Sequence, residues 1–338
     1  MSAHWHKELY MFLAPFILIA AIIYTVARTL TTNDSAPQST SYLRYRATMR
    51  KRLKAAIIPP IAAAVILTTY GIVAQALDPT NPNVVPEPLR ITLGLLWWPG
   101  ICLFPLLAML LTEKTTRPSG PPVATLAPRG TRELIPRWLL RFVSSICLIA
   151  ALTPLILVSP LGATRIMRSA NNPPTVNYSV DGTDIWMAYV VFLVAAILTV
   201  SVIRVTIRRR DIDPITGSDG WSRSGTAVRA LCVLYIPAAL VIVNGLTVPR
   251  NAALAYLDHI RAGGESIDGW PRWLASTAPA YIADGTSAML MLGVVVALVI
   301  FARPPMPRAL ALTAESPIPA PHHNTNDPND PNDQAAAR

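Results

Sequence analysis

The side chains best suited to chemistry gather in one polar segment, residues 250–284, which separates two long apolar runs. Its candidate residues are Asp258, His259, Arg261, Glu265 and Asp268. Imidazole and carboxylate groups are common zinc ligands, so this segment could form a metal or small-molecule site together with His4 and His6. The same residue types are also ordinary in a polar loop beside a membrane. We favour the loop interpretation and predict no metal site.

Basic side chains form two further groups near the ends of apolar runs. The first group is Arg44, Arg46, Arg50, Lys51, Arg52 and Lys54, and the second is Arg208, Arg209 and Arg210. A basic side chain near an anionic membrane surface contributes about 1 kcal/mol to binding. Both groups are therefore candidate contacts for anionic lipid headgroups or for a protein partner. The alternative is that they only orient the chain in the membrane.

No set of residues predicts catalysis. Glu113 and Arg117 have the ExxxR spacing of some glutamate-dependent membrane proteases, but the paired glutamates and intramembrane histidines of that class are missing. Motifs of the HExxH and GxSxG types and glycine-rich phosphate loops do not occur in the sequence. The apolar runs contain no charge or histidine, whereas ion-driven carriers usually place such groups at membrane depth. We predict no catalytic residue and no cofactor, and an ion-driven carrier is disfavoured.

The composition indicates that these candidate residues are positioned by segments that lie in a membrane. Hydrophobic residues make up 52% of the 338 residues and charged residues only 14%, well below the roughly 25% of a soluble domain. Seven uncharged runs recur, at residues 9–27, 55–77, 91–112, 142–164, 185–203, 230–249 and 285–302. A lone apolar run satisfies its backbone in lipid only as a helix. The sequence therefore predicts an all-α, polytopic membrane helical bundle with seven transmembrane helices in residues 1–302.

The charge pattern predicts the orientation of this bundle. Alternate segments between the runs hold 7, 6, 6 and 3 of the 29 Lys and Arg residues, and the other four hold 1, 1, 2 and 3. Because positively charged loops stay in the cytoplasm, we expect the N-terminus outside and the C-terminus inside. A cleaved signal peptide at residues 9–27 is the alternative, but it would place the first basic loop outside. The net charge of +10 is explained by these loops rather than by nucleic-acid binding.

Local patterns add four expectations. Tyr42, Tyr45, Met49 and Leu53 recur at helical spacing and predict an interfacial helix that leads into the second span. Residues 251–264 predict a separate short helix that lies on the membrane, with Leu254, Leu257 and Ile260 on one face. Prolines predict kinks in four spans: Pro59, Pro60, Pro99, Pro105, Pro154 and Pro237. Residues 303–338 have the low-complexity composition of a disordered cytoplasmic tail.

One loop resembles a known group of proteins. Segment 113–138 is similar to the inner loop of uncharacterised multi-pass membrane proteins of actinobacteria, with a Glu before an Arg-Pro-x-Gly turn and a Pro-Arg-x-Leu beginning of the next helix. The matching residues are Glu113, Arg117, Pro118, Gly120, Ala127, Arg129, Arg132, Pro136 and Arg137. Pro121 and Pro122 depart from this pattern. The resemblance implies a bacterial plasma membrane and no particular activity.

Two classes of function remain from the sequence. The first is a non-enzymatic permease-like or scaffold subunit that acts with a separate partner, because no segment outside the apolar runs exceeds 36 residues, too few for a nucleotide-binding domain. The second is a membrane sensor or small-molecule binder that uses residues 250–284. In both cases the expected surroundings are membrane lipids, including anionic headgroups.

Overall fold

The computed structural model describes residues 40–77, 87–116, 134–162, 165–167, 176–180, 182–209, 218–261, 272–274 and 276–305. Its long helices are α2 (Thr40–Leu77), α3 (Glu87–Thr115), α5 (Arg137–Leu152), α6 (Thr183–Arg208), α7 (Ser218–Arg261) and α8 (Ala278–Ala302). A 3-10 segment, η1 (Thr153–Val158), extends α5. The chain is thus a helical protein with six helices in the described residues that are long and apolar enough to cross a membrane, when α5 is taken with η1.

These helices correspond to six of the seven predicted spans, which makes the chain a multi-pass membrane protein. The first predicted span, residues 9–27, lies outside the described residues, as does the predicted tail from residue 306 onward. Apolar side chains cover the outer faces of the helices, for example Leu148, Ile197 and Met289, which are 63%, 67% and 72% exposed. Such a surface is stable only where it faces lipid or another apolar partner.

Helix α2 contains the helical segment that was expected to lead into the second span, but it buries the apolar face of that segment inside the protein. Thr40–Leu77 is a single helix that continues through Pro59 and Pro60. The predicted apolar face does exist, since Tyr45, Met49 and Leu53 are all buried, but it packs within the protein core. The protein interior therefore replaces the membrane surface that the sequence pattern suggested.

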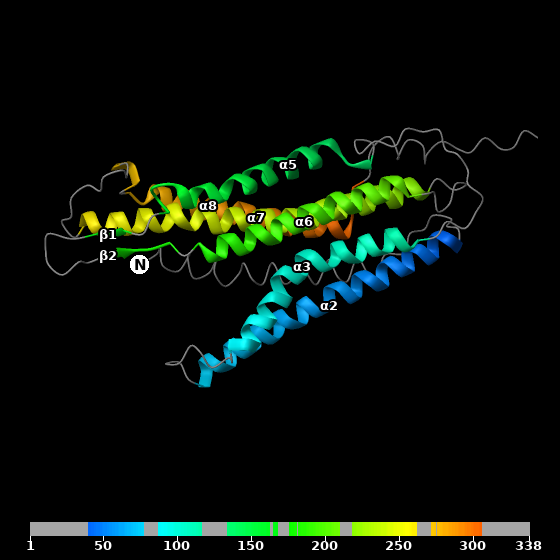
Figure 1. The fold of residues 1–338 in the computed structure, drawn as a ribbon, viewed down its shortest axis with the longest axis horizontal. Coiled ribbons are helices and arrows are strands. Elements are labelled where there is room, and N and C mark those ends of the chain that lie inside the picture. Colours follow the sequence, from blue (N-terminus) through cyan, green and yellow to red (C-terminus); the bar gives the residue numbers. More distant parts are fainter. Residues whose placement is uncertain are drawn as a thin grey trace, which may run out of the picture.

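Proline has different effects in the different helices. Pro154 lies in the first turn of η1, and the α-helical geometry of α5 ends two residues earlier, at Leu152, so the fourth span is a shorter α-helix than residues 142–164 predicted. Pro99 and Pro105 lie inside α3, which is visibly bent in Figure 1. A proline removes one backbone hydrogen bond and clashes with the preceding turn, which accounts for both results.

Helix α7 corrects the prediction of a second short helix at residues 251–264. Ser218–Arg261 is one helix of 44 residues, so the sixth span and the predicted short helix are continuous through Pro237 and Pro249. Its outer turns bury Ala252, Ala253 and Tyr256, whereas Leu254 and Ile260 of the predicted membrane face are each 37% exposed. At 1.5 Å per residue this helix is about 66 Å long, roughly twice the thickness of a bilayer core.

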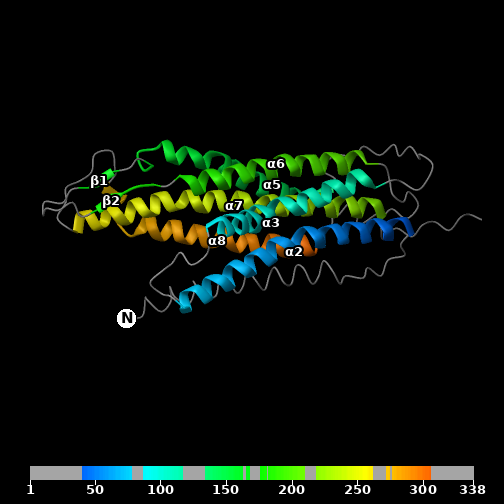
Figure 2. The same cartoon turned by 60° about the horizontal axis from the view of Figure 1, so that its bottom comes forward.

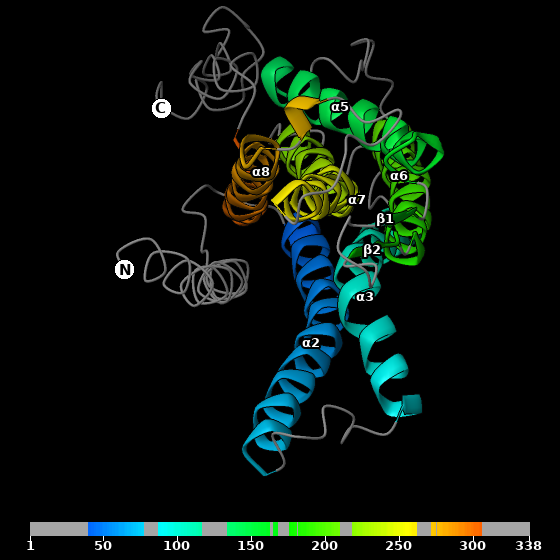
Figure 3. The ribbon, with the colours of Figure 1, turned by 90° about the vertical axis from the view of Figure 1, so that its left-hand side faces the viewer.

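The helices are arranged around α7. In its most apolar window 72% of the residues are buried, against 17–33% in the other spans, and it packs against α3, α5, α6 and α8. Helices α2 and α3 form an antiparallel pair at one side (Figure 1). Seen along the long axis, this pair diverges from the other helices (Figure 3). We call the end of the bundle that holds Tyr45, Glu113 and Arg209 the basic end.

A small cap lies at the opposite end of the bundle. Strands β1 (Arg165–Met167) and β2 (Val176–Tyr178) pair antiparallel, and they lie beside the last turns of α7 (Figure 2). The Tyr178 hydroxyl donates to the carbonyls of Leu161 and Val248, at 2.7 and 3.2 Å. Burial raises the pKa of Tyr178 to about 12, which keeps the hydroxyl protonated as a donor. Tyr178 also packs with Ala252, Ala253 and Tyr256 in one buried cluster, which covers part of α7 beyond its apolar run.

Candidate functional site: a buried ionic network at the basic end

Four helices each bring at least one ionisable or phenolic side chain to the same place at the basic end. Tyr45 comes from the start of α2, Glu113 from the last turns of α3, Arg209 from the end of α6, and Asp219 and Arg223 from the start of α7. All five side chains are buried, with exposed fractions of 3–8%. We call this set the basic-end network. Burying so many charges is costly unless each one is paired, so the pairing decides whether the site is stable.

Arg209 is the centre of the basic-end network. Its Nη1 donates to Oε2 of Glu113 at 2.7 Å, and its Nη2 donates to Oδ1 of Asp219 at 2.9 Å. The guanidinium also lies over the ring of Tyr45, with 4.8 Å from Cζ to the ring centroid. Tyr45 in turn donates its hydroxyl to Oε1 of Glu113 at 2.7 Å. One cation therefore joins α2, α3, α6 and α7 through charge-assisted contacts.

Arg223 completes the basic-end network and caps the C-terminal end of α6. Its Nε donates to Oδ2 of Asp219, four residues earlier on the same helix. Its terminal nitrogens donate to the carbonyls of Ile207 and Arg209 at 2.9 and 2.6 Å. The last carbonyls of a helix have no partner within the helix, so a cation placed there satisfies them and interacts well with the helix dipole. Arg223 is thus both an ion-pair partner and a cap.

The charges of the basic-end network cancel, because two carboxylates face two guanidiniums. Burial by itself would lower the pKa of Arg209, but its attraction to Tyr45, Glu113 and Asp219 outweighs burial and raises the pKa above its ordinary value. Among the described residues, Nε of Arg209 has no hydrogen-bond partner, so the side chain is held through its two terminal nitrogens. An arginine whose charge is matched by two carboxylates is a structural connector rather than an acid or base for catalysis.

The predicted basic surface residues differ in their exposure. Arg44, Lys51, Lys54 and Arg208 are exposed, and Arg46, Arg50 and Arg52 are partly buried. Arg52 also donates to the Thr115 hydroxyl at 2.7 Å, which joins α2 to α3. Arg209 is buried in the basic-end network and is not available to lipid headgroups or to a partner, and Arg210 lies outside the described residues.

The structure only partly assembles the polar group predicted in residues 250–284. Asp258 and Arg261 are exposed, with 3.9 Å between Oδ1 of Asp258 and Nη1 of Arg261, whereas His259 is buried. Glu265 and Asp268 lie outside the described residues, as do His4 and His6. Within the part of the chain that is described, no three metal-ligating side chains lie close enough to hold an ion.

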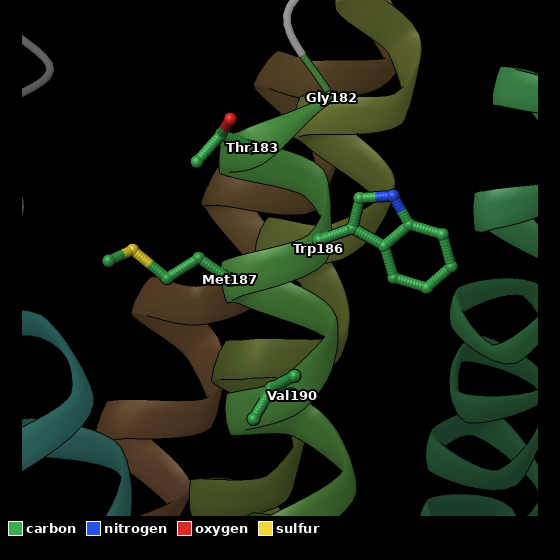
Figure 4. Close-up of a pocket in the computed structure, with 5 residues that line it drawn as sticks. All are labelled: Gly182, Thr183, Trp186, Met187 and Val190. Carbon is green, nitrogen blue, oxygen red and sulfur yellow. The ribbon is translucent and has the colours of Figure 1, made fainter.

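A shallow hollow lies on α6 near the opposite end of the bundle. Its lining residues are Gly182, Thr183, Trp186, Met187 and Val190, and Trp186 and Met187 point to opposite sides of the helix (Figure 4). Trp186, Met187 and Val190 are 51%, 43% and 56% exposed. The hollow is therefore a wide, mainly apolar helix surface that suits lipid chains better than a polar ligand.

Sequence reasoning missed most of the basic-end network. The sequence pattern places Tyr45 on an apolar face and Glu113 in an inner loop and in an ExxxR spacing with Arg117, and it does not single out Asp219 or Arg223. One signal was present, because Asp219 and Arg223 have the four-residue spacing of a helical ion pair. The pairing of Glu113 with Arg209 joins residues 96 positions apart, and nothing local in the sequence encodes it.

Comparison with family models, with curated proteins and with solved structures finds no match for this chain.

Proposed function

We propose that this chain is a permease-like membrane subunit that acts with a separate partner, and that the α2–α3 pair is its moving part. The observation that carries this proposal is the uneven attachment of the pair. At the basic end it is tied to α6 and α7 by the basic-end network, and toward the opposite end it diverges from the bundle (Figures 1 and 3). A pair of helices fixed at one end and separated at the other can pivot.

Burial along the two helices supports this pivot. On α3, Cys102, Leu106 and Met109 are completely buried, whereas Ile91 and Leu95 in the other half are 52% and 50% exposed. Helix α2 shows the same gradient over the side chains that the structure describes: Tyr45, Met49 and Leu53 are buried near its start, whereas Val65, Ile66 and Val73 are 58%, 50% and 49% exposed. Elements with few buried contacts move at low free-energy cost, so the diverging halves are the ones expected to move.

The proposal places the basic end in the cytoplasm of a bacterial cell. This orientation follows from the positively charged segments, and the plasma membrane follows from the resemblance of segment 113–138 to actinobacterial membrane proteins. Reporter domains fused after Arg210 and after Asp268 are expected to report opposite sides of the membrane, with the Arg210 fusion inside. A phosphatase and a fluorescent protein make a suitable reporter pair, since each is active on one side only. Agreement between the two fusion sites would contradict this topology.

Spin-label distances test the moving pair directly. One label pair joins Val73 of α2 to Met187 of α6 in the diverging region, and the control pair joins Lys51 of α2 to Arg208 of α6 at the basic end; all four side chains are exposed. The three native cysteines are first replaced by alanine. We expect a broad or two-peaked distance distribution for the first pair and a single narrow one for the control pair. Two narrow distributions, unchanged between detergent and lipid nanodiscs, would rule out the proposal.

A further inference from the structure

Helix α5 carries an unusual stripe on the face that points away from the bundle. Leu139, Val143 and Ala150 are buried on its inner face. The outer face is apolar at Leu148, Ile149 and Leu152, which are 50–63% exposed, and this surface continues to Leu155 of η1. Toward the basic end, within two helical turns, the apolar side chains of this stripe give way to basic and aromatic ones. We call these basic and aromatic residues, 137, 138, 141 and 142, the α5 rim.

The α5 rim combines two cations with two aromatic rings. Arg137 and Arg141 are both exposed, and Trp138 and Phe142 are 56% and 48% exposed. Phe142 lies at the edge of the outer face, where its ring stacks on Tyr235 of α7 with 5.6 Å between centroids. Aromatic rings beside basic side chains at the end of an apolar surface are typical of the layer where lipid headgroups begin.

The two arginines of the α5 rim are arranged unfavourably with respect to the part of the protein that the structure describes. Arg137 and Arg141 are four residues apart, so their charges lie on the same side of the helix and repel each other. Neither has an acidic partner among the described residues, in contrast with Arg209 and Arg223 of the basic-end network. An anion placed between the two guanidiniums would offset this repulsion and accept hydrogen bonds from both.

We propose that the α5 rim binds the headgroup of an anionic phospholipid. Arg137 and Arg141 hold its phosphate, Trp138 lies at the headgroup layer, and the acyl chains run along the apolar stripe toward Leu155. A phospholipid fits better than a soluble anion because the cationic pair continues directly into a surface that needs apolar cover. The pairing gives α5 a preference for anionic over zwitterionic lipid, independently of whether the protein transports anything.

Native mass spectrometry of the full chain tests this preference. The protein in mild detergent is offered phosphatidylglycerol or phosphatidylcholine with identical acyl chains, and the retained lipids are counted. We expect the wild type to favour phosphatidylglycerol, and Arg137→Gln with Arg141→Gln to reduce that preference about tenfold, because each basic side chain contributes appreciably to anionic lipid binding. Arg137→Lys with Arg141→Lys keeps the charge and should retain most of the preference.

The matched control removes two exposed cations from the same end of the bundle without touching the stripe. Lys114→Gln with Arg204→Gln has the same change in net charge, and both side chains are exposed. This control should keep the wild-type preference. Equal retention of the two lipids by the wild type, an unchanged preference in the Gln variant, or an equal loss in the control would each overturn the proposal. If the double Gln variant does not fold, Arg141→Gln alone gives the same comparison with a smaller expected change.

Discussion

Replacement of Arg209 by methionine is expected to lower the free energy of unfolding by about 3–5 kcal/mol, because it leaves buried charge without its partner. The side chains of Arg209 and Glu113 are 4% and 0% exposed, so water cannot replace the lost contact. Asp219 would still pair with Arg223, but Glu113 would retain only the hydroxyl of Tyr45. Chemical unfolding in detergent micelles, followed by circular dichroism, measures the change.

The neighbouring residue supplies a stringent control for this substitution. Arg208→Met removes the same charge one position earlier on α6, where the side chain is exposed. Its effect on the unfolding free energy should stay within about 0.5 kcal/mol. The double variant Glu113→Leu with Arg209→Met removes both members of the pair, and its loss should be clearly smaller than the sum of the single losses. Additive losses would show that the two residues do not interact.

The second large effect is expected at the contact between α7 and α8. Gly293→Ala should destabilise the protein by about 1–3 kcal/mol, the usual range for adding a group to a filled interior. A Cβ at Gly293 would overlap with the hydroxyl oxygen of Tyr235 and lie 2.8 Å from its ring carbon Cζ. Tyr235 has little freedom to move away, because it is 2% exposed and donates to the carbonyl of Leu290 at 3.2 Å. The same unfolding assay measures this change.

A substitution at a second glycine of α8 distinguishes the effect of crowding from the effect of helix propensity. A Cβ at Gly285 would meet no atom within 4 Å, so Gly285→Ala should be neutral or stabilise the protein by up to about 1 kcal/mol. Tyr235→Phe removes the hydroxyl that obstructs Gly293→Ala, and the combined variant should recover part of the loss. Equal effects at the two glycines would mean that close packing of α7 and α8 is not what requires Gly293.

The spans were predictable because lipid leaves the backbone few alternatives. Each long uncharged run has to satisfy its own hydrogen bonds, so the runs at 91–112, 185–203 and 285–302 all lie within helices of the structure. The same reasoning failed beyond the membrane. Pro249 and the charge of Arg250 suggested that the sixth span ends there, but Arg250 pairs with Asp284 at 2.6 Å and the helix continues.

The basic-end network was not predictable, and the reason is physical. A charge next to an apolar run is compatible either with an exposed position at the membrane surface or with a buried pair, and its local sequence is the same in both cases. Arg208 and Arg209 show this, since adjacent arginines at the end of α6 have opposite surroundings. The difference arises from the direction each side chain takes from the helix and from partners far away in the sequence.

That distance in the sequence has a consequence for how the protein is made. Glu113 cannot pair until Arg209 has been synthesised, 96 residues later. At synthesis rates of about 5–20 residues per second, this delay lasts roughly 5–20 s. During that interval α2 and α3 have already been synthesised, but the cation that pairs with Glu113 in the finished structure is still missing. Because burying an unpaired carboxylate is costly, Glu113 gains its final buried position only after α6 has been made.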